Sequence, residues 1–293
     1  MKPEIRVKPL SIPVRIIGPG SQPSEAEPLN MLPLPTGMST FQMPTVPESA
    51  DRRAMARARD ALADLLDQLQ AWNGTDEAHP RLDVATLDDA ALDVLNQVLG
   101  EGEVSIRLQG EPEIQIQESL FAGLWRVQRL HPDRRLQGDK IEACSIPGIV
   151  RQVAAAAAIS LRTVDIPATA MNSPALLTEI RERMHRYRPG QPAHVVNLTL
   201  LPLAPDDHRV LEQALPVGAV AVMSRGFGNC RITSTTARHV WRVQYFNNMQ
   251  TLILNTIEVV DVPEVAIAAP DDLAATRERL AELIEWMTED CEA

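Results

Sequence analysis

The chain has 293 residues, of which 45% are hydrophobic, and its formal net charge is −11 at pH 7. This length can hold two ordinary domains or one domain built from repeated halves, and the apolar fraction can support a buried core. The negative charge argues against a general nucleic-acid binder, because such a protein neutralises phosphates with clustered lysine and arginine. An acidic protein more readily meets a basic partner.

Targeting and redox signals are sparse. Prolines and charges interrupt every apolar run in the first 20 residues, and no later stretch reaches the roughly 18 apolar residues that span a bilayer. We therefore expect a cytoplasmic protein without membrane insertion. Cys144, Cys230 and Cys291 are widely spaced and odd in number, which favours neither a disulfide framework nor a CxxC motif. The histidines show no metal-ligand spacing either, so we expect no metal and no cofactor.

Residues 1–50 differ in composition from the rest of the chain. Ten of the 23 prolines lie there, and they prevent any long regular element. The segment is predicted to be a proline-rich arm, which is either a loosely packed tail or a polyproline-like docking segment. In the second case the residues expected to contact a partner include Pro33, Leu34, Pro35 and Phe41.

The remainder contains the same unit twice. At an offset of 116 positions, residues 102–149 align without a gap with residues 218–265, and 12 of the 48 pairs are identical. The identical pairs include the tetrapeptide "WRVQ", which begins at Trp125 and again at Trp241. Two copies of more than 100 residues indicate a tandem duplication of domain size rather than a solenoid of short repeats. We place the first repeat at residues 51–166 and the second at residues 167–293.

Each repeat mixes helical and strand periodicity, so we predict an α+β fold of two tandem repeats with antiparallel strands and helices packed on one face. A helix is expected over residues 52–72 and ends near Asn73 and Gly74. In the second repeat we expect helices over 173–187, after Asp206 and Asp207, and over 271–289, with strands over 194–203, 218–224, 229–233, 240–246 and 251–260.

Residues that both repeats keep are expected to be structural. Trp125 and Trp241 are predicted core anchors. Arg126 and Glu142 are matched by Arg242 and Glu258, which suggests an Arg–Glu contact within each repeat, because a catalytic pair seldom needs to exist twice.

The hairpin sequence "SRGFGNCRITST", Ser224 to Thr235, is where the repeats diverge most in charge. Cys230 falls on the position of Ile114, so strand alternation favours a buried structural cysteine over a nucleophile. The glycines suit a tight turn, and the lysine and helix of a phosphate loop are missing. We predict partner contact here, through Arg225, Gly226, Phe227, Gly228, Asn229 and Arg231.

Residues 215–265, with "SRGFGNCRITST", "VWRVQYFN" and "LILNTIEVVDVPEV", closely resemble the C-terminal region of the HupH/HyaF/HoxQ family of hydrogenase expression and formation proteins. "LPLPTGMSTF", "GEGEVSI" and "IQESLFAGLWRVQ" are similar to the same family, so the resemblance covers nearly the whole chain.

The resemblance implies a non-enzymatic maturation factor for uptake [NiFe] hydrogenases. It would hold the precursor of the iron–sulfur small subunit, together with other accessory proteins, during cluster assembly and before twin-arginine export. An acidic surface suits the basic patch of a twin-arginine signal. Two alternatives stay open: an iron or iron–sulfur scaffold that uses Cys230 with Cys144 or Cys291, and a thiol-dependent enzyme that uses Cys230.

Overall fold

The structure is a computed structural model that describes residues 51–74, 78–225 and 229–292, and side chains as far as residue 289. The predicted arm contacts Pro33, Leu34, Pro35 and Phe41 lie outside the described residues, as do Gly226, Phe227 and Gly228 in the hairpin. All the structural statements below concern the described part.

The first repeat begins with a helix whose buried face carries Leu62, Leu65 and Leu69 at helical spacing, and the Asp51 carboxylate caps its N-terminus. Four longer strands follow a short edge strand and a second helix. In chain order the elements are α1 (Arg52–Ala71), β1 (Arg81–Asp83), η2 (Val84–Thr86), α2 (Asp89–Leu99), β2 (Val104–Leu108), β3 (Glu113–Glu118), β4 (Leu124–Leu130), β5 (Leu136–Ala143) and α3 (Gly148–Ala155).

The second repeat follows the same order and adds a long C-terminal helix. Its elements are α4 (Ser173–Arg186), β6 (His194–Asn197), η3 (Leu198–Leu200), α5 (Pro205–Ala214), β7 (Val217–Ser224), β8 (Asn229–Thr235), β9 (Val240–Phe246), β10 (Leu252–Val259), η4 (Glu264–Ala266) and α6 (Pro270–Glu292). The strand expected over 194–203 is shorter than predicted, because the Asn197 side chain accepts a hydrogen bond from the Thr199 N–H and starts η3.

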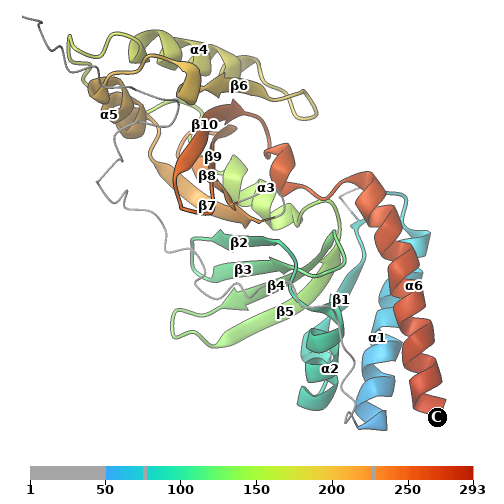
Figure 1. The fold of residues 1–293 in the computed structure, drawn as a ribbon. Coiled ribbons are helices and arrows are strands. Elements are labelled where there is room, and N and C mark those ends of the chain that lie inside the picture. The colour runs from blue at the N-terminus through green and yellow to red at the C-terminus, as the bar shows by residue number, and fades with distance from the viewer. Residues whose placement is uncertain (1–50, 75–77, 226–228, 293) are drawn as a thin grey trace, which may run out of the picture. The chain divides into compact units, whose positions relative to one another are not determined.

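All ten strands form one antiparallel sheet in the order β1-β5-β4-β3-β2-β7-β8-β9-β10-β6. Counted inwards from its two edges, the sheet has equivalent strands of the two repeats at each position, because the repeats meet through their equivalent strands β2 and β7 (Figure 1). Ile106 pairs with Val222, which is its own counterpart at the 116-residue offset. A pseudo-twofold axis therefore passes between these two residues, as in an isologous dimer interface.

Two backbone hydrogen bonds between the repeats are related by the same axis. Gln109 N–H donates to the Ala219 carbonyl at 2.8 Å, and its counterpart Arg225 N–H donates to the Glu103 carbonyl at 3.2 Å. The α+β class with antiparallel strands is thus confirmed, and the two repeats share one continuous sheet.

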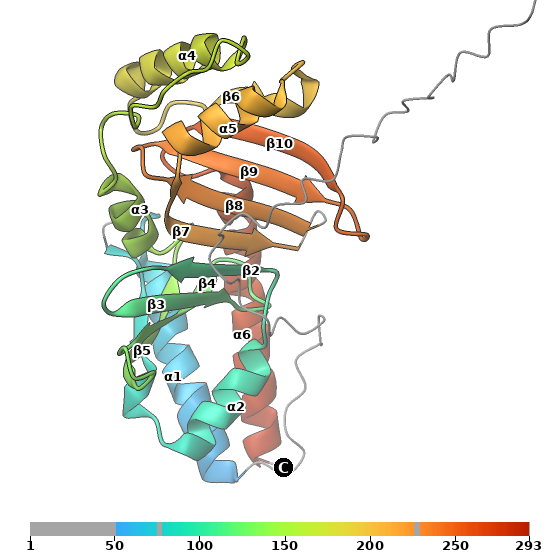
Figure 2. The same ribbon diagram turned by 90° about the vertical axis from the view of Figure 1, so that its left-hand side faces the viewer.

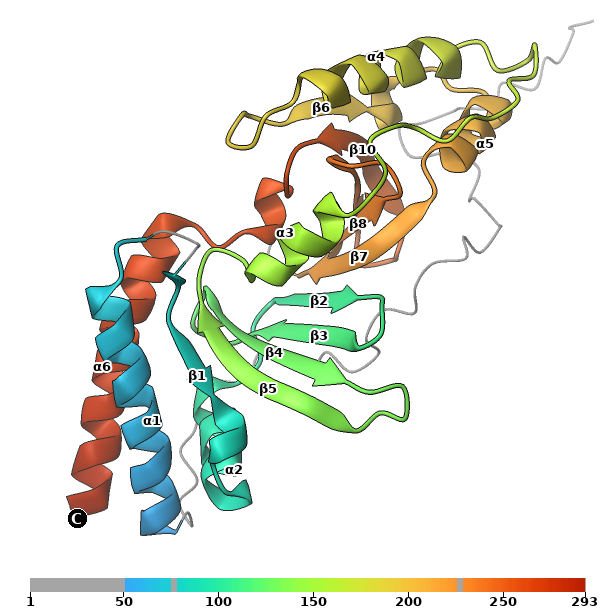
Figure 3. The same cartoon turned by 180° about the vertical axis from the view of Figure 1, so that it is seen from behind.

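Helices cover the sheet unequally. The pairs α1–α2 and α4–α5 pack against the same face, where Leu124 and Ile141 lie in the first repeat and Ile257 in the second. The shorter α3 lies against β7 and carries the buried residues Val150 and Ala154 (Figure 2). The C-terminal helix α6 runs alongside α1 of the first repeat (Figure 3), and Leu280 and Met287 are buried there.

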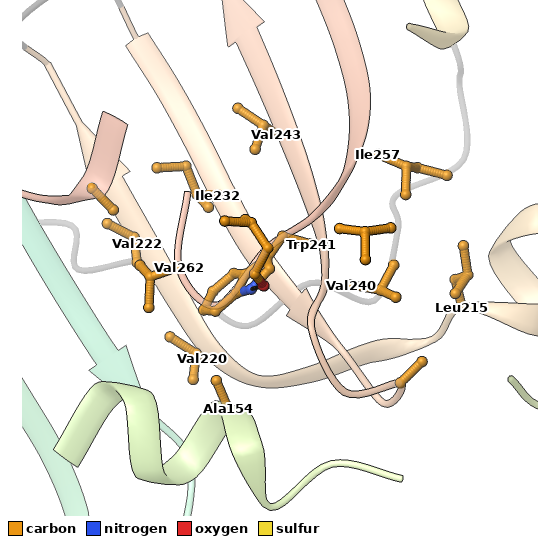
Figure 4. Close-up of a cluster of buried hydrophobic side chains, with 14 of the residues drawn as sticks. Ala154, Leu215, Val220, Val222, Ile232, Val240, Trp241, Val243, Ile257 and Val262 are labelled. Carbon is orange, nitrogen blue, oxygen red and sulfur yellow. Dashed lines mark hydrogen bonds between the residues drawn. The ribbon is translucent and has the colours of Figure 1, made fainter. Parts of the chain in front are cut away.

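The two tryptophans anchor equivalent positions of the core. Both indoles are buried, and Trp241 lies among Val220, Ile232 and Val262 (Figure 4). Trp125 Nε1 donates to the Cys144 carbonyl at 3.0 Å, and Trp241 Nε1 donates to the equivalent Val260 carbonyl at 3.2 Å. Each indole therefore ties the end of β5 or β10 to the neighbouring strand, which satisfies its polar atom in an apolar setting.

Candidate functional site

The hairpin between β7 and β8 carries the predicted partner contacts Arg225, Asn229 and Arg231. Ser224 pairs with Cys230 at the last step of the ladder before the turn. The Arg225 backbone is held by the Glu103 carbonyl of the first repeat, so the base of the hairpin is fixed from both sides. This junction between the repeats positions the side chains that follow.

Cys230 points into the core, as strand alternation predicts. Its side chain is only 2% exposed, and burial raises the pKa of the thiol to about 11 despite a hydrogen bond with Tyr245. The same burial raises the pKa of Tyr245 to about 12. A thiol with a raised pKa is a poor nucleophile at neutral pH, so the structure favours the structural interpretation of Cys230.

Arg231 faces the opposite side of the sheet from Cys230. Its guanidinium carbon lies 5.1 Å from the centre of the Phe246 ring, which is a cation–π distance, and burial lowers the pKa of Arg231 from its usual value. Met223 lies across from it in the β7–β8 ladder. The groove at this place has a volume of about 290 Å³ and is lined by Met223, Arg225, Asn229, Cys230, Arg231, Phe246 and Gln250.

Two exposed apolar side chains lie close in the chain to the groove residue Gln250. Met249, in the β9–β10 turn next to Gln250, is 85% exposed, and Ile253 on β10 is 56% exposed. Arginine combined with aromatic and methionine side chains is typical of protein-contact surfaces. The hairpin end of the second repeat therefore offers a cationic group within an adaptable apolar surround.

The first repeat differs at the equivalent place. Arg107 holds the position of Met223, and it forms an ion pair of 2.7 Å with Glu113, which holds the position of Asn229. Gln115, the counterpart of Arg231, also donates to Glu113 at 2.9 Å. The cation of the first hairpin is thus neutralised by a carboxylate within the repeat.

The expected Arg–Glu contacts within each repeat are wrong. In the β4–β5 ladder Arg126 pairs with Ile141, whereas Glu142 pairs with Trp125, so the two side chains lie on opposite faces of the sheet. Arg126 instead bonds Asp139 at 2.6 Å. Its counterpart Arg242 donates to Asn255 at 3.1 Å and lies 3.6 Å from Glu212.

The glutamates that both repeats share have different surroundings. Glu142 is buried with His79, and although burial would raise its pKa, hydrogen bonds from His79 and Lys140 lower it to about 2. Burial raises the pKa of Glu258, which bonds the Thr256 hydroxyl at 3.2 Å. Equivalent backbone positions therefore hold the same residue in different electrostatic states.

One group of side chains was missed by the sequence analysis. His79, Glu142 and Cys144 are buried together, and one potential ligand atom of each lies within 4.8 Å of the others. Sequence spacing could not reveal it, because 63 positions separate His79 from Glu142. The signal was the i, i+2 pattern of Glu142 and Cys144, which places both on one face of β5 and its continuation.

Other predicted groups are accounted for structurally. Asp206 and Asp207 lie in the first turn of α5, and the Asp207 carboxylate accepts backbone N–H groups of Asn172, Ser173 and Ala204. It thereby joins the starts of α4 and α5. Every helix in the described part of the chain is too short or too polar to span a bilayer.

Known proteins resemble the chain over most of its length. The C-terminal conserved region of the HupH hydrogenase expression protein matches twice, at residues 55–166 and 170–287. Hydrogenase expression/formation protein HoxQ of Cupriavidus necator is 44% identical over 278 residues, which cover 94% of this chain and 97% of that protein. Hydrogenase-1 operon protein HyaF of Escherichia coli is 32% identical, over 94% of this chain and 96% of that protein.

A solved structure, hydrogenase expression protein HupH from Thiobacillus denitrificans, is 31% identical and covers 39% of this chain and 95% of its own, with a TM-score of 0.37. The two matches of the family region fall on the two repeats and include the hairpin, the tryptophans and the strands that carry them. The predicted family resemblance is confirmed, and the chain belongs to the HupH family of hydrogenase expression proteins.

Proposed function

We propose that this chain is a holding factor for the iron–sulfur small subunit of an uptake [NiFe] hydrogenase, and that the groove around Arg231 is its contact surface. The coarser role, hydrogenase maturation, follows from the family and from the names of its relatives. In this proposal the protein acts in the cytoplasm, with other accessory proteins, on the precursor before twin-arginine export. It performs no catalysis itself.

The difference between the two hairpins is the observation that carries the proposal. Arg231 lies over Phe246 at a groove that Met223 also lines. The first repeat has Gln115 at the position of Arg231, and its Arg107–Glu113 ion pair occupies the positions of Met223 and Asn229. A guanidinium stacked on an aromatic ring binds carboxylates or carbonyl oxygens well, because its planar fork is already ordered. The groove thus suits an acidic or carbonyl-rich segment flanked by apolar side chains.

The overall charge gives the precursor a second attachment. The net charge of −11 attracts the basic region of a twin-arginine signal over a longer range, which mainly accelerates encounter. The cationic groove cannot hold that basic region, so the signal and the groove must contact different parts of the precursor. We therefore assign the groove to the mature part of the small subunit.

The two rival functions receive less support from the thiol. An iron or iron–sulfur scaffold on Cys230 would need thiolate ligands, and a thiol-dependent enzyme would need a thiolate nucleophile. Burial instead raises the pKa of Cys230 to about 11, which disfavours the thiolate that both functions require. Cys144 is also buried, and the group of possible ligands that the described residues contain surrounds Cys144, not Cys230.

The test is co-purification of the full chain with the small-subunit precursor, made with and without its signal peptide. Arg231→Gln places the residue of the first repeat in the groove and should weaken capture of both forms about tenfold or more, because hot-spot arginines contribute about 2 kcal/mol. The matched control is Arg107→Gln, which removes the same charge from the first hairpin and should leave capture unchanged.

Three outcomes would count against the proposal. Equal loss in Arg231→Gln and Arg107→Gln would show that total charge, not the groove, governs binding. Capture of the large subunit in place of the small subunit would reject the proposed partner. Capture of no hydrogenase subunit would reject the holding role and favour the scaffold alternative.

A further inference from the structure

His79, Glu142 and Cys144 stand on one face of the sheet in the first repeat. Arg81 pairs with Glu142 in the β1–β5 ladder, and the Ala143 N–H donates to the Pro80 carbonyl at 3.0 Å, so the same register continues past the end of β1. His79 therefore lies opposite Cys144, and each is two residues from a member of the Arg81–Glu142 pair. All three side chains are less than 9% exposed.

The atoms are arranged as ligands would be. His79 Nε2 lies 3.0 Å from Glu142 Oε2, and one donor atom of each residue lies within 4.8 Å of the others. Two ligands about 2.0–2.3 Å from a tetrahedral ion are about 3.3–3.7 Å apart, so the group needs to contract only slightly around an ion. Imidazole, carboxylate and thiolate together suit a divalent ion of intermediate softness, such as Zn²⁺.

Two neighbours compete for the same nitrogen of His79, and a bound ion would resolve this competition. Arg81 Nε donates to His79 Nε2 at 3.3 Å, while the carboxylate oxygen of Glu142 lies near the same nitrogen. An imidazole nitrogen can donate or accept a hydrogen bond, but it cannot do both. If Nε2 carries a proton it can bond Glu142 but not Arg81, and if it carries none it can bond Arg81 but not the Glu142 carboxylate. A cation on the Nε2 lone pair would suit the carboxylate and displace only the longer contact from Arg81, whose side chain is exposed.

Neighbouring groups already hold the ligands in place. The Cys144 N–H donates to the Gly123 carbonyl at 2.9 Å, and the Cys144 carbonyl accepts from the Trp125 indole, so the backbone of this residue is fixed at both ends. Lys140 forms an ion pair with Glu142 Oε1, which leaves Oε2 to face His79. Such second contacts orient metal ligands in known sites.

The second repeat shows that the backbone does not require these residue types. It keeps the glutamate, as Glu258, but Val260 holds the position of Cys144. Ala193 holds the place that continues β6 opposite Val260, where the first repeat has His79. The same fold thus accommodates an apolar pair, and the first repeat alone combines imidazole, carboxylate and thiol.

We propose that His79 Nε2, Glu142 Oε2 and Cys144 Sγ bind one divalent transition-metal ion, with a fourth position open to water or another ligand. The thiol must lose its proton when the ion binds, so binding should strengthen as the pH rises. The ion would join β1 to β5 and the loop after it. This inference is independent of the groove and of the proposed partner.

The test uses the untagged full chain in a Cys291→Ser background, freed of metal with a chelator and titrated with Co²⁺. One equivalent should give a thiolate-to-cobalt charge-transfer band that Zn²⁺ abolishes, and Zn²⁺ should raise the thermal midpoint. Because the site is buried, the titration is repeated with Co²⁺ present during refolding, so that slow entry cannot imitate a lack of binding.

Variants separate the site from other thiols. Cys144→Val installs the residue of the second repeat and should abolish the band, and Glu142→Gln should weaken Co²⁺ binding about tenfold or more. Glu258→Gln and Cys230→Ser, the matched controls, should retain both band and thermal shift. The absence of a band in the unsubstituted protein refolded with Co²⁺ would overturn the proposal. The persistence of the band in Cys144→Val would also overturn it.

Discussion

The first β-hairpins of the two repeats use the same backbone for different surfaces. In the first repeat Arg107, Glu113 and Gln115 bond one another, so the hairpin satisfies its own charges. In the second, Met223 and Asn229 replace the ion pair, and Arg231 lies over Phe246 beside a groove. The two copies thus share one hairpin backbone, which carries an internal ion pair in the first copy and a groove in the second.

Near the outer edges of the sheet it is the first repeat that carries the unusual group of side chains. There the first repeat carries His79, Glu142 and Cys144, whereas the second has Ala193 and Val260 at the positions of His79 and Cys144 beside Glu258. The two copies therefore differ in side-chain chemistry at different ends of the same unit. Substitutions that exchange residues between the repeats can break this comparison or sharpen it, and the following three are ordered by the size of the expected effect.

The largest effect is expected for the arginines of β4 and β9. Arg126 pairs with Asp139, whose side chain is 2% exposed, whereas Arg242 donates to the neutral Asn255. Arg126→Met would leave a buried carboxylate, although Gln128 still donates to it, and should lower the free energy of unfolding by about 3 kcal/mol. Arg242→Met should lower it by only about 1 kcal/mol.

Urea unfolding of the two methionine variants measures this difference. The double variant Arg126→Met with Asp139→Asn serves as the control, because its neutral residue matches Asn255 of the second repeat, and it should recover most of the lost stability. Equal costs for Arg126→Met and Arg242→Met would contradict the assignment of a buried charge to the first repeat only.

A smaller effect is expected at Gly123 and its counterpart His239, which both have positive φ angles, of 81° and 65°. Their carbonyls accept equivalent bonds, from Cys144 and Val260. A Cβ at residue 123 would clash with Leu273 at the start of α6, whereas the His239 ring has room beside Tyr187, 4.9 Å away between ring centres.

Gly123→Ala should therefore lower the free energy of unfolding by about 2 kcal/mol, through the left-handed backbone and the displaced leucine. His239→Ala keeps the backbone strain that the histidine already bears, so it should cost less than about 1 kcal/mol. Thermal unfolding compares the two. If Gly123→Ala costs less in a Leu273→Ala background than in the parent, the clash with α6 is its cause; an unchanged cost assigns it to the backbone angle.

The smallest effect concerns pH. Burial raises the pKa of Glu118 to about 7, with contributions from Glu103 and Asp272, despite a hydrogen bond from the Gly123 N–H. The folded protein then holds a proton that the unfolded chain releases near its ordinary pKa of 4.5. Stability is fully present below that value and is lost as the pH rises towards 7.

Glu118→Gln should remove this loss, so that the variant gains about 1 kcal/mol over the parent near pH 5.5 and gains little near pH 4. Denaturant unfolding across that range measures it. The control is Ser234→Ala at the equivalent position, where the Ser234 hydroxyl accepts from the Val220 N–H, and its cost should not vary with pH. A constant difference between Glu118→Gln and its parent would show that the carboxyl titrates normally.

The sequence by itself determined the elements, the duplication and the family. Periodicity suffices for most elements and the gapless 116-residue offset for the duplication, because strand alternation and helical spacing are local properties. The family was indicated by the resemblance of motifs such as "VWRVQYFN" to known members. Alternation placed Cys230 in the core correctly. Alternation could not separate Arg126 from Glu142, because they lie on different strands and only the register of β4 with β5 places them on opposite faces.

The tertiary structure alone decided how the copies combine. Only the pairing of β2 with β7 shows that the repeats form one sheet about a pseudo-twofold axis, and only the position of Leu273 at the start of α6 shows what a side chain at Gly123 would meet. The joining of His79 to Glu142 and Cys144 likewise depends on the register of β1 with β5. These contacts join residues distant in the chain, so they depend on strand order and packing, which local sequence patterns do not encode.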